Sequence, residues 1–473
     1  MLRPWKLEIQ LDNQSDKAIY LQIADAIIKD IHSGRLKAGD ALPGSRNLAA
    51  LLNVNRNTVI EALQVLINEE WVVSRERKGI FVSATLPAFS GKQPAVPVAI
   101  TVAEATGNRY HIQFDDGHPD SKIAPVTELA RAYRQIFNRK ARWQMMGYGD
   151  EYGDAAFRKA IMHMLNHQRG ISITEDGICI TRGSQMAMYL AFQCLIEKGD
   201  YVLVENPGYK PAWKAAESAG ARLLPVSVDS DGMIIEEVIR HLRSRRKIKA
   251  IYTTPHRQYP TTVTLSLQRR LALIKLANEY GFTIIEDDYD NEFCFGYRPV
   301  MPLSSFSELN QYVYIGTMSK VVAPALRIGY LVSNNVDLIR QVGALRRIID
   351  VQGDAIMEQA VLQLIKDGTI KRHIRKATSL YKAKRDFTAT LLDKHLAGKV
   401  TYHLPEGGLA FWITPLSPVN WQVIQEKLSA KGIRIITPDN YSIDTPVNGM
   451  RLSYGALSEV QLEEGIAALA AYI

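Results

Sequence analysis

Apolar residues near the N-terminus recur at the spacing of α-helices. The first helix ends at Ser33-Gly34, and one of its faces carries four apolar side chains: Tyr20, Ile23, Ile27 and Ile31. Pro43-Gly44-Ser45 then breaks the chain, and Ser45 is expected to cap a second helix over Arg46–Leu52. The pattern predicts two short helices joined by a turn.

A third helix and a small hairpin follow. The helix begins near Asn55, and its apolar positions recur at i, i+3, i+4, i+7 and i+8: Val59, Ala62, Leu63, Leu66 and Ile67. Trp71–Val73 and Ile80–Val82 are β-branched or aromatic, with polar residues 74–78 and then Gly79 between them. This spacing predicts a two-stranded wing after three helices.

From about residue 111 onward, strand-like runs alternate with amphipathic helices. The apolar runs expected to be strands are Ile178–Thr181, Tyr201–Glu205, Ala250–Thr253, Thr283–Glu286, Tyr312–Gly316 and Gly329–Val332. Such alternation predicts a parallel sheet covered by helices on both faces. From about residue 355, long helices precede shorter alternating segments, which indicates a smaller α+β domain at the end of the chain.

These patterns divide the chain into domains. We expect a small helical domain with a wing at residues 15–84, a linker at residues 85–110 with three prolines, and a larger domain at residues 111–473. Within the last, the large part covers about 140–350 and the small part about 355–473. A chain of 473 residues is too long for a single hydrophobic core, which agrees with this division.

Composition narrows the class of protein. With 47% hydrophobic and 22% charged residues, the chain is typical of a globular protein, and no apolar stretch is long enough for a membrane span. No secretory signal is expected at the start of the chain. The three cysteines form no CxxC pair, which favours the reducing cytoplasm and argues against a thiolate metal site; we expect no metal.

The net charge of +8 makes an acidic partner plausible, but it does not locate the surface that would bind one. Residues 1–85 hold 11 basic and 10 acidic residues. The basic excess lies later, in Arg240–Lys249 and Lys371–Arg385. Such runs are usually solvated helix faces, and the alternative is that they add phosphate contacts to bent DNA.

The second and third helices have the layout of a helix-turn-helix. In that motif, residues at the start of the second of its two helices enter the major groove of DNA. Asn55-Arg56-Asn57-Thr58 stands at this point, and arginine and asparagine side chains can pair with guanine and adenine edges. On helix pattern alone, a small helical domain with polar caps is an equal alternative.

Details of the sequence favour DNA binding. The run ALPGSRNLAALLNVNRNTVIEALQVLINEEWV, ending in the wing KGIFV, resembles the winged helix-turn-helix of GntR-type bacterial regulators. The resemblance implies a set of contacts to double-stranded operator DNA, with Gly79 at the tip of the wing: Arg46, Asn55, Arg56, Asn57 and Thr58. Ile60 stands where some members of the family carry a base-reading arginine, so the operator sequence does not follow.

The densest candidate chemistry lies in Gly316-Thr317-Met318-Ser319-Lys320 and in Arg327 soon after it. A lysine that forms a Schiff base must be partly desolvated and held beside an aldehyde. The hydroxyls of Thr317 and Ser319 can bond a phosphate, and Arg327 can bind it bidentately. A lone Ser-Lys pair would usually be a surface lysine, so this motif needs support from the rest of the chain.

A predicted strand ending in acids supplies part of that support. In Thr283–Tyr289, Asp287 and Tyr289 share one face of the strand, and Asp288 faces the other way. A carboxylate at this position can pair with a protonated pyridine nitrogen, and a phenol can bond a ring hydroxyl. Paired acids at a strand end could instead bind Mg²⁺.

Two further turns complete the pattern. Thr181-Arg182-Gly183-Ser184-Gln185 leads from a strand into a helix, and the backbone amides at such a helix start bind anions, although this motif is more often a simple cap. Asn206-Pro207-Gly208-Tyr209 follows the next strand and could place Tyr209 against a flat ring.

The order and spacing of these motifs resemble class I aminotransferases, which are fold-type I pyridoxal-phosphate enzymes. The resemblance runs from about residue 112 to the C-terminus and implies that Lys320 carries the Schiff base, with Asp287 on the pyridine nitrogen and Tyr289 on the ring oxygen. It implies that Tyr209 stacks on the ring and that a further group holds the phosphate: Gly183, Ser184, Gln185, Thr317, Ser319 and Arg327.

The same resemblance implies two more roles. Tyr148 matches a tyrosine that reaches the phosphate of the neighbouring subunit, which implies a homodimer. Arg451 matches the arginine that receives a substrate carboxylate, although alone it would be a structural strand arginine. The chain departs from the family at Tyr259-Pro260-Thr261-Thr262, where Asn-Pro-Thr-Gly is usual, and at Lys210-Pro211, where some members place a second arginine.

The two halves together resemble MocR-type (PdxR-type) regulators, which join a GntR-like winged helix to an aminotransferase-like domain. This resemblance implies a multidomain protein: a winged helix-turn-helix, an α/β fold-type I domain and a small C-terminal α+β subdomain. We expect a transcriptional regulator whose pyridoxal phosphate senses an amine or amino acid through an external aldimine, or which senses pyridoxal phosphate itself. The alternative is a working aminotransferase, because its lysine, aspartate and arginine are all present.

Overall fold

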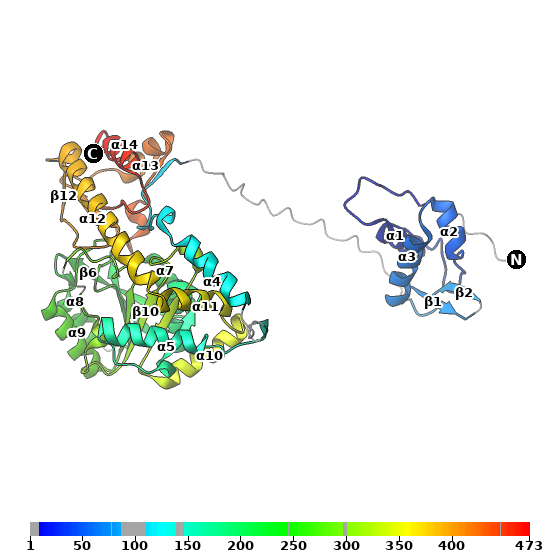
Figure 1. Ribbon diagram of the computed structural model, residues 1–473, viewed down its shortest axis with the longest axis horizontal. Coiled ribbons are helices and arrows are strands. Elements are labelled where there is room, and N and C mark those ends of the chain that lie inside the picture. Colours follow the sequence, from blue (N-terminus) through cyan, green and yellow to red (C-terminus); the bar gives the residue numbers. More distant parts are fainter. Residues whose placement is uncertain are drawn as a thin grey trace. The chain divides into compact units, whose positions relative to one another are not determined.

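The computed structural model describes residues 9–76, 78–86, 110–138, 143, 146–244, 246–296, 300–444 and 446–473. The chain divides into two compact units, Met1–Ala105 and Thr106–Ile473, each of which is a separate body in Figure 1. The predicted linker at residues 85–110 lies almost entirely outside the described residues. In the part of the chain that is described, no helix is both long and apolar enough to cross a membrane.

The first unit is a winged helix, as predicted. Its described elements are α1 (Ile19–His32), α2 (Ser45–Leu52), α3 (Arg56–Asn68), β1 (Val72–Arg75) and β2 (Gly79–Val82). The strands form an antiparallel hairpin in which Val72 pairs with Val82. The apolar faces of the helices meet in one buried core that includes Ile27, Leu48, Val59 and Leu66. The helical spacing in the sequence therefore corresponds to burial.

The helix-turn-helix differs from the prediction at one cap. Gly44, not Ser45, is the N-cap of α2, and Ser45 is the first helical residue. The hydroxyl of Ser45 instead accepts a hydrogen bond from Nε of Arg56 at 3.4 Å, which joins α2 to the start of α3. Asn53 adopts a left-handed conformation (φ 51°) and ends α2, so the turn between the helices is tight.

The second unit is built on an eight-stranded sheet within the described residues, in the order β4-β11-β10-β9-β8-β5-β6-β7. The strands are β4 (Ile178–Thr181), β5 (Tyr201–Asn206), β6 (Arg222–Asp229), β7 (Gly232–Met233), β8 (Ile248–Thr253), β9 (Thr283–Asp288), β10 (Tyr312–Thr317) and β11 (Gly329–Val332). All six predicted strands are present.

The expectation of a fully parallel sheet is wrong at β11. This strand runs antiparallel to both β10 and β4, and β7 runs antiparallel to β6. The physical reason is the short connection from β10 to β11, residues 318–328, which contains no crossover helix. A parallel neighbour needs a crossover of a dozen or more residues, so this connection returns the chain in the opposite direction.

Helices cover both faces of the sheet, as the alternating pattern predicts. One core lies between the sheet and α6 (Gly183–Leu195), α7 (Lys210–Ser218) and α10 (Val336–Ile349). The other face packs against α4 (Val126–Asn138), α5 (Ala155–Met164), α8 (Ile235–Leu242), α9 (Leu267–Tyr280) and α11 (Ala355–Lys366). The carboxyl ends of the central strands therefore lie at one edge between two helical layers, where open α/β sheets bind ligands.

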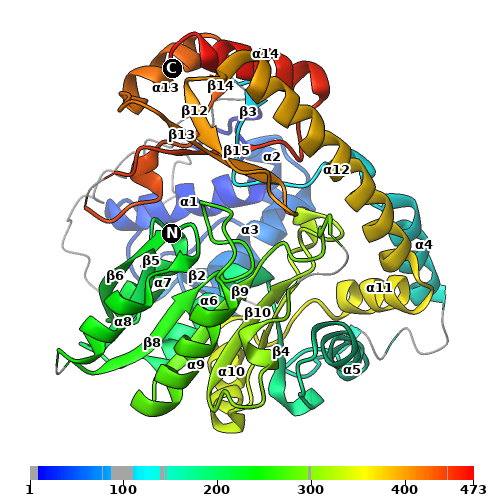
Figure 2. The ribbon, with the colours of Figure 1, turned by 90° about the vertical axis from the view of Figure 1, so that its left-hand side faces the viewer.

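The C-terminal part has a core of its own. It contains the antiparallel strands β12 (Val400–Tyr402), β13 (Ala410–Pro415) and β15 (Met450–Ser453), the pair β3 (Ile112–Gln113) and β14 (Ile433–Arg434), and helices α13 (Trp421–Ala430) and α14 (Glu459–Ala470). Figure 2 shows the long helix α12 (Thr369–Leu396) running from this part towards α11. Ile112 and Phe114, near the start of the second unit, are buried in the same core.

Candidate functional site

The predicted DNA-contacting residues gather at α2, α3 and the wing. Asn55 caps α3, and its side chain accepts a hydrogen bond from the backbone amide of Asn57 at 2.8 Å. Four polar side chains of this group are exposed: Arg46, Asn55, Arg56 and Asn57. Thr58 is half-buried. The helix start thus presents donors and acceptors to solvent, where a major groove could meet them.

Gly79 lies beside the tip of the wing rather than in the turn itself. It is the first residue of β2 and pairs with Arg75 of β1. Its φ of +107° is a conformation that side chains rarely adopt, and a Cβ there would meet no atom within 4 Å. The glycine is therefore required by backbone conformation and not by crowding.

In the second unit, most of the predicted cofactor-binding residues line one cavity at the carboxyl ends of β9 and β10. The cavity encloses about 780 Å³, including its mouth to solvent. Eight predicted residues line it: Ser184, Tyr209, Asp287, Tyr289, Thr317, Ser319, Lys320 and Arg327. They come from five separate segments of the sequence. The motifs suggested that these residues share a site, and the fold brings them together.

Lys320 follows β10 in a tight turn and is half-buried. Its Nζ lies 4.5 Å from the centre of the Tyr289 ring. Burial lowers the pKa of the Lys320 amine, and the nearby carboxylate of Asp290 opposes this shift. A lysine with a lowered pKa is more often neutral and therefore a better nucleophile towards an aldehyde.

Asp287 ends β9 with only one of its two carboxylate oxygens bonded. Oδ2 accepts a hydrogen bond of 2.8 Å from the hydroxyl of Tyr252. Oδ1 is buried and has no hydrogen-bond partner among the described residues. Burial raises the pKa of this carboxyl to about 7. A buried acceptor without a hydrogen bond lowers the stability of the folded protein. A ligand that donates a hydrogen bond to Oδ1 would remove this cost.

Asp288 points to the opposite face of the strand, as predicted. It forms an ion pair with Arg169 and accepts a hydrogen bond of 2.7 Å from the hydroxyl of Tyr314. Because Asp287 and Asp288 diverge, they do not form a shared cation site. No group of three or more acidic, histidine or cysteine side chains in the described ranges has the geometry to hold a metal ion.

Aromatic rings form one wall of the cavity. Tyr209 and Tyr259 meet edge to face with their centres 5.0 Å apart, and Tyr289 packs against Tyr259 at 6.4 Å. The hydroxyl of Tyr289 donates to the backbone carbonyl of Arg257 at 3.0 Å. These contacts fix the rings at the positions where a flat ligand would contact them.

Near the start of α6, the cavity wall carries groups that can donate hydrogen bonds to an anion. Gly183 begins α6 with φ of +79°, and a Cβ there would lie 2.8 Å from Nη2 of Arg327. Arg327 itself has φ of +50°, and its Nη2 donates to the carbonyl of Arg182 at 3.3 Å. Thr317 and Ser319 also line the cavity, and their hydroxyls donate to the carbonyl of Ile328 at 3.1 and 3.4 Å. The helix start, the guanidinium and the hydroxyls together suit a phosphate.

Besides Gly183, three predicted residues of this unit lie outside the cavity wall. Gln185 turns its amide towards the carbonyl of Pro211, at 3.4 Å. Arg451, on β15, is only 1% exposed, and its Nη1 donates to the carbonyl of Pro260 at 3.1 Å. The side chain of Tyr148 is 90% exposed on the surface of the second unit.

Sequence reasoning did not single out several residues of the site. Asp116 and His118 line the cavity from the polar turn that follows β3, and Tyr252 reaches Asp287 from the neighbouring strand β8. The signal for the first two was the run Asp115-Asp116-Gly117-His118 directly after a short apolar segment. No local signal marks Tyr252, because its role depends on which strand lies beside β9.

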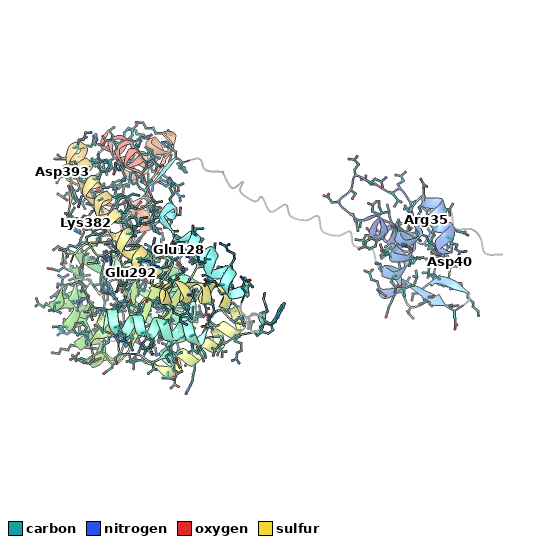
Figure 3. All side chains as sticks on the ribbon, viewed as in Figure 1. Arg35, Asp40, Glu128, Glu292, Lys382 and Asp393 are labelled. Atoms are coloured by element: carbon teal, nitrogen blue, oxygen red, sulfur yellow. The ribbon has the colours of Figure 1, made fainter. Side chains whose placement is uncertain are left out.

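The two basic runs of the sequence, at residues 240–249 and 371–385, each contain a lysine that forms an ion pair. Lys382 on α12 is exposed, as Figure 3 indicates, whereas Lys384 pairs with Asp120 at 3.3 Å. Lys247 pairs with Asp200 at 3.1 Å and with Glu197 at 3.2 Å. The exposed part of the run on α12 is thus a solvated helix face.

Comparison with known proteins adds two family matches. Residues 112–469 match the family described as aminotransferase class I and II. Residues 19–82 match the bacterial regulatory proteins of the gntR family. The first match covers most of the chain, and the second corresponds to the winged helix.

Similar proteins include both regulators and enzymes. A "Probable rhizopine catabolism regulatory protein MocR" of Rhizobium meliloti is 27% identical, over 97% of this chain and 94% of the relative. The "HTH-type transcriptional regulator TauR" of Rhodobacter capsulatus is 26% identical over 95% of each chain. The solved structure of a Pyrococcus horikoshii kynurenine aminotransferase superposes with a TM-score of 0.71 and 29% identity, over 76% of this chain and 90% of that one. The resemblance to the enzyme stops short of the winged helix.

Proposed function

Because this chain belongs to the aminotransferase class I and II family and joins that domain to a GntR-family winged helix, we propose that it is a transcriptional regulator that binds pyridoxal phosphate. The observation that carries the proposal is the presence in one chain of a complete winged helix and of a cavity with Lys320 and Asp287 on its wall. The two regulators described above are similar to this chain over nearly their whole length.

The residues of the cavity fit the cofactor. The free, buried Oδ1 of Asp287 is an acceptor for a pyridinium N–H, and the crowded contact between Gly183 and Arg327 leaves a cradle that only a glycine allows. The cofactor supplies an aldehyde that bonds covalently to amines, and its ring acts as an electron sink. Lys320 is the amine of this chain that would hold it. Tyr209 would stack on the pyridine ring, and the hydroxyl of Tyr289 would bond the ring oxygen.

The phosphate would be held near the start of α6. The amides at the start of α6 at Gly183, Ser184 and Gln185, the hydroxyls of Thr317 and Ser319, and the guanidinium of Arg327 would bind it. Only the backbone of Gln185 would take part, since its side chain bonds Pro211.

A homodimer is part of the proposal. Tyr148 would reach the phosphate of a second copy, because in its own chain the side chain is almost fully exposed. Other large apolar side chains of the second unit are also exposed: Met146, Ile348, Ile349 and Val351. The amide of Gly149 donates to the side chain of Gln352, so the two segments that carry these residues lie side by side. Clustered apolar exposure of this kind marks an interaction surface.

The signal would be an amine or amino acid that displaces Lys320 from the cofactor, or the cofactor itself. Either one must bind two conformations of the protein unequally to change its affinity for DNA. Arg451 would receive a carboxylate of an amino acid, which requires Tyr259 to move, since the guanidinium lies 5.1 Å from the centre of that ring and is buried. DNA would be read by the start of α3, with Arg46, Asn55, Arg56, Asn57 and Thr58 as the contacts and Gly79 beside the wing tip.

The proposal is tested with purified protein, candidate amines and a keto acid. Absorbance of the lysine-bound cofactor and footprinting on the DNA upstream of the protein's own gene are followed together. We expect Lys320→Ala to abolish that absorbance and to leave nonspecific DNA binding intact. Many turnovers of amine without a sequence-specific footprint would overturn the regulator and favour a working aminotransferase. A monomer by sedimentation would contradict the dimer.

A further inference from the structure

One charged group of the cavity wall has no role in holding the cofactor. Asp287, Lys320 and Arg327 would all contact it. Nδ1 of His118 lies 3.0 Å from Oδ2 of Asp115, and this hydrogen bond raises the pKa of His118, so the imidazole is directed to Asp115. Asp116 remains, half-buried, with no cationic partner within ion-pair distance among the described residues. The wall therefore presents one carboxylate that no described cationic side chain pairs with directly. Its charge opposes the effect of burial on the pKa of Lys320 and of Arg451 nearby, and favours the charged form of both.

Asp116 is held in place. The hydroxyl of Tyr259 donates a hydrogen bond to its Oδ1. Tyr259 is in turn packed between Tyr209 at 5.0 Å and Tyr441 at 5.8 Å. A carboxylate fixed by a buried phenol loses little conformational freedom when a ligand binds, so this geometry favours tight binding of a complementary charge.

Tyr259, which bonds Asp116, and its neighbour Tyr289 each lie close to a cation of this chain. Nζ of Lys320 lies 4.5 Å from the centre of the Tyr289 ring, and the guanidinium of Arg451 lies 5.1 Å from that of Tyr259. Aromatic faces attract ammonium groups through their quadrupole, and a carboxylate beside them adds a charge-assisted hydrogen bond. Rings and a fixed carboxylate together have the chemistry of an ammonium-binding subsite.

An anionic group of the effector has no direct access to Arg451. Arg451 is 1% exposed, bonds the carbonyl of Pro260 and lies behind Tyr259, so a carboxylate reaches it only after that ring moves. A carboxylate that stayed in the cavity would lie near Asp116 and be repelled. Beside Asp116, the cavity as it stands favours a positive group over a negative one.

We propose that the effector carries two amino groups, one that reacts at the cofactor and a second, protonated one that binds Asp116 and the adjoining tyrosine rings. This inference rests on the proposed function, because the first amine takes the place of Lys320. In that exchange a carbon–nitrogen bond to the effector forms as the bond to Lys320 breaks, and Lys320 leaves as a free amine with no net change in water. The effector class is thus a diamine or a basic amino acid.

The test compares four amines of similar length on the cofactor-loaded, full-length protein. Butylamine and putrescine differ only by the second amino group, and norleucine and lysine differ in the same way but add a carboxylate. Affinities come from calorimetry and from the absorbance of the lysine-bound cofactor. We expect putrescine to bind about tenfold or more tightly than butylamine, and lysine to exceed norleucine by a similar factor, as one charge-assisted hydrogen bond would give.

Asp116→Asn keeps an acceptor for Tyr259 and removes the charge, so it should abolish the preference and change butylamine affinity by less than about twofold. Asp337→Asn, which removes a charge from the exposed surface of α10, controls for the overall field and should keep the preference. Equal affinities of the wild-type protein for putrescine and butylamine would overturn the inference, as would a preference that survives in Asp116→Asn. If Asp116→Asn does not fold, Asp116→Glu takes its place and must retain the preference at altered diamine length. A wild-type protein that takes up no cofactor would instead refute the proposed function.

Discussion

The hydroxyl of Tyr252 donates to Oδ2 of Asp287 at 2.8 Å and leaves Oδ1 of the same carboxylate buried without a partner among the described residues. Tyr252 lies on β8 and Asp287 on the adjacent strand β9. Pairing of the two strands therefore places Tyr252 beside Asp287. The hydrogen bond fixes one carboxylate oxygen and leaves the other free for a ligand in the cavity.

Tyr252→Phe should lower the affinity for pyridoxal phosphate by about tenfold, since Asp287 loses the donor that orients it. Spectroscopic titration of the cofactor-free protein measures this affinity. Tyr314→Phe is the matched control, because it removes a hydroxyl of similar burial that donates to Asp288 at 2.7 Å on the other face of the strand. Both variants should lose stability, and equal losses of cofactor affinity would contradict the role given to Tyr252.

Asp287→Asn should remove one contribution to the pH dependence of the stability of the cofactor-free protein. Burial raises the pKa of the Asp287 carboxyl to about 7, so the native state binds a proton that the unfolded chain releases near pH 4. The stabilisation from that proton is complete below the unfolded pKa and is lost as the pH rises towards 7.

The asparagine variant lacks this titration. Its free energy of unfolding should therefore rise relative to wild type by up to about 3 kcal/mol from near pH 5 to near pH 8. Denaturant unfolding at both pH values measures the difference. A constant difference across this range would show that the carboxyl does not titrate there.

Gly183→Ala should disable the phosphate cradle. Its Cβ would lie 2.8 Å from the Arg327 guanidinium, which must then move, and we expect cofactor affinity to fall about tenfold or more. Gly281→Ala is the control, because Gly281 has a similar φ of +73° but open space around it. Both alanines should cost about 1 kcal/mol through backbone strain. Comparable cofactor affinity in the two variants would rule out a crowded cradle at Gly183.

Asn55→Asp should distinguish the two roles of this residue, capping α3 and contacting DNA. Aspartate caps a helix as well as asparagine does, so thermal unfolding of the variant should match wild type, whereas Asn55→Ala should lose about 1 kcal/mol. The added negative charge should weaken binding to a nonspecific duplex at low salt about tenfold, because it faces phosphates. Unchanged duplex affinity of Asn55→Asp, measured by fluorescence anisotropy, would place DNA elsewhere.

The sequence predicted those features that depend on neighbouring residues. The alternation within β9 separates Asp287 from Asp288, and the helical spacing of Val59, Leu63 and Leu66 corresponds to burial in the winged helix. Motif order was enough to indicate that Lys320, Arg327 and Ser184 share a site, and the structure brings all three to one cavity.

What the sequence could not predict depends on contacts between distant segments. The antiparallel direction of β11 follows from a short connection, and the contact of Tyr252 with Asp287 follows from strand order. Arg451 on β15 bonds the carbonyl of Pro260, and Ser45 bonds Arg56 of the next helix while Gly44 takes the cap position. None of these pairings has a local pattern in the chain.

The helix α12 has a mechanical consequence. Its 28 residues form one continuous rod, about 42 Å long. Ile370, near one end, is buried in the core of the large sheet, and Leu391, near the other, is buried in the core of the C-terminal part. With Ile370 as the pivot, a tilt of about 5° would move the far end of the helix, and the core packed on it, by about 4 Å. A small tilt at Ile370 would therefore reach the C-terminal part as a larger displacement, with the helix intact in between.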